Sequence, residues 1–312
     1  MLNFKKLIDR MTLEQKVDLI IRKDIHQNGS VPDLSIPGLF SYELDKQNNE
    51  TMNIFFSSIF ETNWDEQSIF ELGKIIGWDA LNKGSNLVFG PKLTMRSENE
   101  GFSSFAPLKV FNSFNSLAKG IDSLGVGFVL NSFANEIQNK NLTNLQKNEY
   151  YAKAFNDLIK GKYINAIKFE RTSLTDPNYV KNELKNKYGY YGPVMIEAIN
   201  KKDAFSRLKE GYDLIFIDDV DSARTEVING VKKYYELFDK LKNNSIDEKE
   251  FNIEINNSQI ISIDQIDLSV DKILTLVLKL SNNEEMNYGL ELLDYHDWQV
   301  DIVLSHTCPI CF

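Results

Sequence analysis

Acidic side chains follow two short apolar runs in the second half of the sequence. These acids are Glu197, Asp218, Asp219 and Asp221. Paired carboxylates can act as nucleophile, general acid or general base, so they are the first candidates for a catalytic site. Acids that follow a strand also cap the next helix, and capping is the interpretation that we favour for Asp221 and the adjacent Ser222.

The residues around these acids predict a β-α-β unit. Apolar runs at 193–196 and 214–217 flank the amphipathic segment 201–210. Gly211 then marks the end of that segment. This alternation is typical of parallel strands that are covered on both faces. Because parallel α/β folds place their chemistry at the carboxyl ends of strands, the position of the acids is itself a functional signal.

Length and charge bound the possible functions. The chain has 312 residues, 42% of them hydrophobic, and a formal net charge of −10. That length suits one barrel-sized domain better than two small ones. The negative charge argues against nucleic acid or an anionic membrane as partner, since both bind clustered lysines and arginines. The sequence shows neither an apolar run of roughly 20 residues nor a secretory signal, so we expect a cytoplasmic protein.

Further strands and helices follow from local patterns. Four more runs are predicted to form strands, at 35–40, 86–91, 125–130 and 164–169. Thr12 and Gln15 form a capping box for one helix, and Asp65 caps another that ends at Gly84. Helices are also expected at 150–160, 223–242 and 268–280, and a polar loop at 243–257.

Several short motifs occur in an order and spacing that resemble those of a known family. They are Trp64-Asp65, Gly84-Ser85-Asn86, Gly90-Pro91 and Arg96-Ser97. A second set around the β-α-β unit comprises Tyr188-Gly189, Ile196-Glu197-Ala198 and Gly211-Tyr212-Asp213-Leu214. On these motifs the chain resembles glycoside hydrolase family 3, the β-glucosidase family. The resemblance covers residues 11–280 and implies an α/β fold, a (β/α)8 TIM-like barrel that is incomplete or distorted, in which six strands can be placed.

The resemblance implies a role for individual residues. Glu197 falls on the position of the family's catalytic nucleophile, which is an aspartate. The acid/base candidates are Glu170, Asp218 and Asp219. The substrate-binding candidates are Glu43, Arg96, Asn131 and Ser132. In a retaining hydrolase one carboxylate attacks the anomeric carbon, and a second one, about 5–5.5 Å away, protonates the leaving oxygen.

The chain departs from the family pattern where contacts with the sugar are expected. Asn131-Ser132 stands where the family has Lys-His, and residues 101–105 lack its second arginine and an acid. Glutamate in place of aspartate also moves the carboxylate of residue 197 by about 1.5 Å, one C–C bond length. We therefore expect a catalytically impaired or inactive relative that serves as a binding or scaffold module. The alternative is an active retaining β-glycosidase that uses Glu197 as its nucleophile.

The end of the chain is too short for a second domain. We divide the chain into a barrel domain, 1–285, and a C-terminal tail, 286–312, that packs on the barrel or extends from it. The tail holds the only cysteines, Cys308 and Cys311, and we favour a terminal apolar segment over a metal or redox site there. We expect a carbohydrate ligand, or a protein partner at the barrel mouth or the tail, and neither a cofactor nor a metal.

Overall fold

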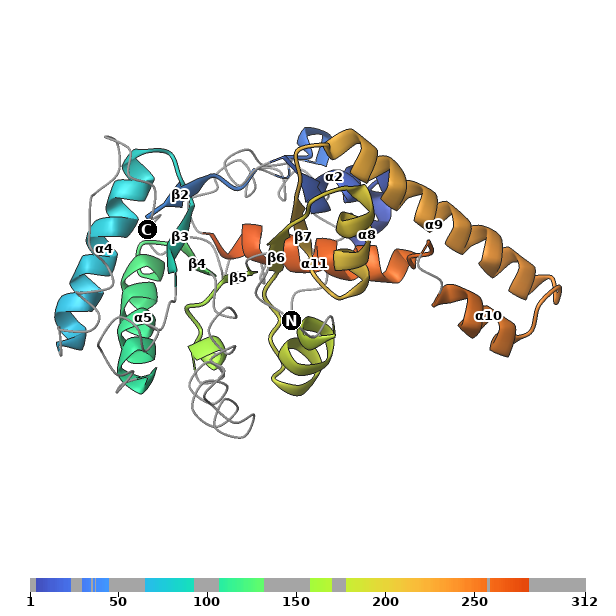
Figure 1. Ribbon diagram of the computed structural model, residues 1–312. Helices are drawn as coiled ribbons and strands as arrows, with labels where there is room; N and C mark the ends of the chain where they lie inside the picture. Colours follow the sequence, from blue (N-terminus) through green and yellow to red (C-terminus); the bar gives the residue numbers. More distant parts are fainter. Residues whose placement is uncertain are drawn as a thin grey trace.

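The computed structural model describes residues 4–23, 30–34, 36, 38–44, 65–92, 107–131, 158–169, 178–256 and 259–280. These residues form a seven-stranded sheet in the order β1-β7-β6-β5-β4-β3-β2, in which all neighbouring strands are parallel. The strands are β1 (Ile21–Arg22), β2 (Ser41–Glu43), β3 (Leu87–Lys92), β4 (Gly127–Asn131), β5 (Ala166–Phe169), β6 (Val194–Glu197) and β7 (Leu214–Phe216). The sheet curls into a half-barrel (Figure 1), an α/β, incomplete TIM-like barrel as the sequence predicts.

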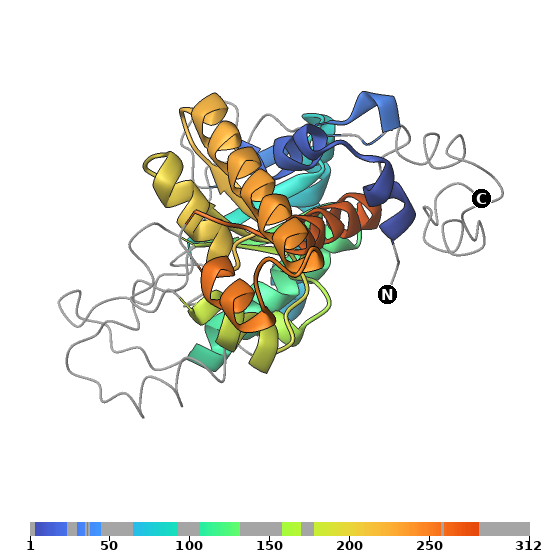
Figure 2. The ribbon, with the colours of Figure 1, turned by 90° about the vertical axis from the view of Figure 1, so that its right-hand side faces the viewer.

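Helices surround this sheet in both views (Figures 1 and 2). The α-helices are α1 (Lys5–Arg10), α2 (Leu13–Ile20), α4 (Glu66–Asn82), α5 (Pro107–Asp122), α8 (Lys201–Lys209), α9 (Val220–Lys242), α10 (Glu248–Ile255) and α11 (Ile263–Lys279). A short 3-10 helix, η1 (Pro32–Leu34), and a π-helix, η5 (Tyr179–Lys187), are also present. None of these helices is long and apolar enough to cross a membrane.

The predicted β-α-β unit is confirmed as β6, α8 and β7. Met195 of β6 is the register partner of Leu214 of β7. The side chain of Asn200 caps α8 by accepting hydrogen bonds from two backbone N–H groups of its first turn. Gly211 has a φ of +100°, a left-handed backbone that favours glycine and turns the chain from α8 toward β7.

Three predicted helix boundaries are also confirmed. Thr12 accepts a hydrogen bond from the backbone N–H of Gln15, and the Gln15 side chain accepts one from the backbone N–H of Thr12. Asp65 caps α4 by accepting from the backbone N–H of Gln67. Gly84 follows the end of that helix with a φ of +73°.

Helix α11 crosses the amino ends of the strands and closes the base of the half-barrel. Ser269 of α11 donates a hydrogen bond to Asp213, which directly precedes β7. Nearer the end of the helix, Lys279 donates to the carbonyl oxygen of Lys162, shortly before β5. Helix α11 thus contacts the amino ends of strands that are not neighbours in the sheet. A functional site is therefore expected at the opposite, carboxyl ends of the strands.

Parts of the prediction were wrong or incomplete. The strand expected at 35–40 begins only at Ser41, and the short strand β1 was not anticipated. The segment expected as a polar loop at 243–257 contains α10, which Asp247 and Glu250 start with a capping box. Phe251 of α10 packs edge-on against Tyr234 of α9, which explains why this polar segment is helical.

Two further predictions concern residues at or beyond the edges of the described ranges. Residues 158–160 are helical, and the remainder of the helix predicted at 150–160 lies outside the described residues. The division at residue 285 and the tail 286–312 also lie outside them, so both stay predictions.

Candidate functional site

Polar side chains from four strands share the inner face of the half-barrel, which we define as the face that carries Lys168 and Glu197. Register partners in a parallel sheet point to the same face, and so do residues two apart on one strand. The positions connected in this way, from β2 to β6, are Glu43, Phe89, Val129, Asn131, Lys168, Met195 and Glu197. The opposite face carries Phe169, whose ring packs edge-on against Tyr179 of η5.

We call the polar members of this set the mouth: Glu43, Asn131, Lys168 and Glu197. Three of them end their strands, β2, β4 and β6, and Lys168 is the penultimate residue of β5. Glu43, Asn131 and Lys168 are partly buried, whereas Glu197 is exposed. Carboxylates accept hydrogen bonds, an ammonium donates them and an amide does both, so the mouth offers both donors and acceptors.

Glu197, on the position of the family nucleophile, pairs with Lys168 of the neighbouring strand. The Lys168 Nζ and Glu197 Oε1 atoms are 2.7 Å apart, and the exposed fractions of the two side chains are 13% and 50%. The lysine stem is therefore covered while its ammonium reaches a carboxylate that solvent still contacts. Sequence analysis missed Lys168. The available signal was a lysine inside an otherwise apolar strand, since a charge in that position needs a partner.

Asp218 and Asp219, two acid/base candidates, follow β7 and are both exposed. Asp219 is the N-cap of α9, and its side chain accepts a hydrogen bond from the backbone N–H of Ser222 at 3.3 Å. Capping therefore belongs to Asp219 and not to Asp221, which lies in the first turn of the helix. Asp218 is an exposed carboxylate two residues after the end of β7, and its catalytic role stays a prediction.

Several predicted residues lie outside the described ranges. They are Arg96, Ser132, Glu170, Cys308 and Cys311. The structure thus brings Glu43, Asn131 and Glu197 together on one face, and the roles that the family resemblance assigns to them remain predictions.

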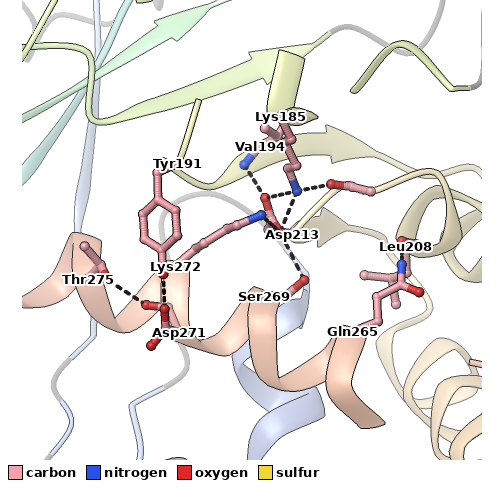
Figure 3. A network of polar contacts seen from close by, with 11 residues as sticks. Lys185, Tyr191, Val194, Leu208, Asp213, Gln265, Ser269, Asp271, Lys272 and Thr275 are labelled. Carbon is pink, nitrogen blue, oxygen red and sulfur yellow. Dashed lines mark hydrogen bonds and ion pairs between the residues drawn. The ribbon is translucent and has the colours of Figure 1, made fainter. Parts of the chain in front are cut away.

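A second polar group, which we call the base cluster, lies at the amino ends of the strands (Figure 3). Its centre is the Asp213 carboxylate, whose side chain is 1% exposed. Lys185 Nζ lies 2.7 Å from one carboxylate oxygen, and Lys272 Nζ lies 3.2 Å from the other. The backbone N–H of Val194 and the hydroxyl of Ser269 donate to the same carboxylate, at 2.9 and 3.1 Å. The group therefore joins η5, β6, the start of β7 and α11.

The base cluster holds two lysines for one carboxylate. Burial lowers the pKa of Lys185 from 10.5 to about 8; the Asp213 carboxylate opposes this shift, and the Lys272 ammonium adds to it. Lys185 also donates to the carbonyl oxygen of Gly211, so its ammonium is surrounded by protein groups. Because the cluster is buried at the base, opposite the mouth, it is suited to stabilising the fold. Among the described residues no group of His, Cys, Asp and Glu side chains could hold a metal ion.

Curated proteins with similar sequences share one description. The chain is 32% identical over 147 residues to the probable β-glucosidase I of Aspergillus terreus, and 31% identical over 147 residues to that of Aspergillus oryzae. Each match covers 42% of this chain and 17% of the relative, so the chain matches less than a fifth of the length of these proteins. No protein-family model matches the chain.

Solved structures with a similar fold include members of glycoside hydrolase family 3. The family 3 β-glucosidase of Bifidobacterium adolescentis has a TM-score of 0.64 at 17% identity, over 96% of this chain and 42% of that one. β-Glucosidase 3B of Thermotoga neapolitana, in complex with α-D-glucose, has a TM-score of 0.56 at 17% identity, over 91% and 43%. A family 3 glycosyl hydrolase of Mycobacterium smegmatis has a TM-score of 0.57 at 11% identity, over 86% and 98%.

Proposed function

We propose that this glycoside hydrolase family 3-like barrel binds a carbohydrate in its mouth and hydrolyses β-glycosides poorly or not at all. The fold and the names of its relatives support a carbohydrate ligand, and glucose is the ligand in the Thermotoga neapolitana complex. The observation that carries the proposal is the position of Glu197. It lies at the carboxyl end of β6, on the inner face, and in an ion pair with Lys168.

Two features of the mouth argue for weak catalysis. Glu197 is one methylene longer than the family's aspartate, and a displacement near 1 Å can lower a rate by about a hundredfold. Asn131 replaces a lysine of the family pattern, so a charged contact to a sugar hydroxyl is missing at that strand end. Hydrogen bonds to sugar hydroxyls stabilise the transition state of glycosidases by roughly several kcal/mol. We expect their loss to lower the rate of turnover more than the affinity for the sugar.

A combined assay of binding and turnover tests this proposal. We expect D-glucose to bind the purified chain in calorimetry, and 4-nitrophenyl β-D-glucoside to turn over far more slowly than about 1 s⁻¹, the low end of ordinary enzymes. The matched variant Glu197→Gln shows how much of that slow rate depends on this carboxylate. Turnover at or above about 1 s⁻¹ that Glu197→Gln abolishes would establish the alternative, an active retaining β-glycosidase. Absence of both binding and turnover would contradict the carbohydrate ligand itself.

A further inference from the structure

Arg22, the last residue of strand β1, carries a buried positive charge that no ion pair compensates in the described part of the chain. We infer that its guanidinium binds an anionic group, a carboxylate or a phosphate, of a sugar in the barrel. This inference rests on the proposed carbohydrate-binding function. It adds to that function the class of ligand and the residue that selects it.

The burial and the hydrogen bonds of Arg22 leave one of its donors unused. The residue is 3% exposed, and its Nε atom donates to the carbonyl oxygen of Leu19 at 2.9 Å. Its NH1 nitrogen is also buried and has no hydrogen-bond partner among the described residues. An unpaired polar group inside a protein is unfavourable, most of all when it is charged. A ligand that supplies the missing acceptor would remove this penalty.

The charged neighbours of Arg22 leave an excess of positive charge. The Oδ1 atom of Asp18 lies 3.0 Å from the Nε atom of Arg224, so this carboxylate already has a partner. The pKa of Arg22 falls from 12.5 to about 9, first because the side chain is buried and second because of the positive charge of Arg224, while Asp18 opposes the shift. Two guanidinium groups thus share one carboxylate, and a bound anion would balance the charge.

The register places Arg22 on the inner face of the half-barrel. Arg22 is the partner of Phe216 on β7, and Phe216 is the partner of Glu197 on β6. Register partners in a parallel sheet point to the same face, so Arg22 shares the face of Glu197. Two strand spacings, roughly 10 Å, separate β1 from β6. Because both side chains are long, one sugar can contact Glu197 and present an anionic substituent to Arg22.

The chemistry of arginine selects the substituent. A guanidinium is planar, and its N–H donors form a fork that fits two oxygens of a carboxylate or a phosphate. Since NH1 is covered in this structure, the guanidinium must turn to meet the ligand. The charge-assisted bonds that form are stronger than the bond to the Leu19 carbonyl oxygen that they replace.

Two nearby acids oppose an anionic ligand only weakly. Asp218 and Asp219 follow strand β7 and are exposed, so water and salt screen their charges. The guanidinium of Arg22 is buried, and its attraction for an anion is stronger in surroundings of low dielectric constant. An anionic substituent is therefore favoured over a hydroxyl group beside Arg22.

Titration of three sugars tests the inference on the wild-type chain. The probes are D-glucose, D-glucuronate and D-glucose 6-phosphate, measured by calorimetry in the same buffer. We expect one or both of the anionic sugars to bind about tenfold or more tightly than D-glucose. The difference between these two shows whether the site prefers a carboxylate or a phosphate. Equal binding of the three sugars, or tightest binding of D-glucose, would overturn the inference.

Variants then identify the residue that binds the anion. Arg22→Met keeps an unbranched side chain without the charge, so it should bind the preferred anionic sugar no more tightly than D-glucose. Arg22→Lys keeps the charge without the fork and should retain part of the preference. The matched control is Arg207→Met, because the Nε and NH1 atoms of Arg207 on α8 pair with Asp203 and Glu210, at 3.2 and 3.0 Å. That control should show the same preference as the wild type.

The melting temperature distinguishes a ligand-binding arginine from a structural one. Without ligand, Arg22→Met removes an uncompensated buried charge, so it should melt at the same temperature as the wild type or higher. If Arg22 instead serves to hold the end of α2 through Leu19, its loss should destabilise the chain. A fall of about 4 °C or more in Arg22→Met would assign this arginine to the fold and contradict the inference.

The outcomes separate this inference from the proposed function. If the wild type binds D-glucose and gains no affinity from an anionic substituent, the inference is wrong and the proposed function stands. If Arg22→Met and Arg207→Met lose the preference alike, a specific role for Arg22 is contradicted. If none of the three sugars binds, the proposed function fails and the inference fails with it.

Discussion

The mouth and the base cluster use the same chemical pair, a lysine and a carboxylate, in opposite surroundings. At the base, the Asp213 side chain is 1% exposed and accepts hydrogen bonds from two lysines, a hydroxyl and a backbone N–H. At the mouth, 50% of the Glu197 side chain is exposed, and its Oε1 atom lies 2.7 Å from the Nζ atom of Lys168. A carboxylate that protein donors surround serves the fold, whereas one that solvent reaches can serve a ligand.

The largest loss of stability is expected from a substitution in the base cluster. Asp213→Asn removes the charge that compensates Lys185 and Lys272, whose side chains are 14% and 4% exposed. We expect the free energy of unfolding to fall by about 3–5 kcal/mol, the usual cost of removing one partner of a buried ion pair. Urea denaturation followed by circular dichroism measures it. A loss below about 1 kcal/mol, the range of exposed pairs, would show that the base cluster contributes little to the fold.

The lowered pKa of Lys185 should make the stability of the protein depend on pH through the base cluster. Its value of about 8 in the folded chain lies below the ordinary 10.5, so between these values the unfolded chain binds more protons than the folded one. The free energy of unfolding should therefore rise with pH from about 8 to 9.5, on the order of 1 kcal/mol, and this gain is lost as the pH falls through 8.

Lys185→Met supplies the control for that measurement. The variant has no ammonium to titrate at this position, so its stability should change less between pH 8 and 9.5 than that of the wild type. The raised pKa values of Tyr179, Tyr191 and Tyr212, caused mainly by burial, keep these tyrosines protonated below pH 10. An identical pH dependence in both proteins would mean that Lys185 is not the group responsible.

The smallest expected effect is on stability at the mouth. Glu197→Gln removes the charge of a half-exposed carboxylate, and the glutamine keeps a side-chain oxygen that can accept a hydrogen bond from Lys168. The free energy of unfolding should change by less than about 1 kcal/mol. The same urea titration as for Asp213→Asn gives the comparison directly. If Glu197→Gln destabilises the protein as much as Asp213→Asn does, the mouth is as important for the fold as the base cluster. The distinction between a structural base cluster and a ligand-binding mouth would then be wrong.

Much of the fold could be predicted because local signals agree with the tertiary structure. The β-α-β unit combines apolar strands, an amphipathic helix and Gly211, and each of these signals agrees with the structure. Helix α10 was missed because its composition is polar, although Asp247 and Glu250 have the spacing of a capping box. Strand β1 has two residues, too few for a periodic pattern to appear.

The site was harder to predict because its pairs join different strands. The family resemblance located Glu43, Asn131 and Glu197, and the register places them on one face. Lys168 was missed because its significance depends on a partner on the next strand, which the sequence does not specify. The capping role of Asp219 was missed because α9 begins at Val220, three residues before the start expected at 223, which makes Asp219 and not Asp221 the cap.

The most direct test of the central claim asks whether Glu197 attacks a sugar or only binds it. A retaining glycosidase forms a covalent bond between its nucleophile and the sugar, and 2-deoxy-2-fluoro-β-D-glucosyl fluoride allows that bond to accumulate. The chain is incubated with this reagent, its intact mass is measured, and peptides that contain Glu197 are sequenced. We predict an unmodified mass after prolonged incubation. A stoichiometric increase in mass that maps to Glu197 would contradict the account and identify the protein as an active β-glycosidase.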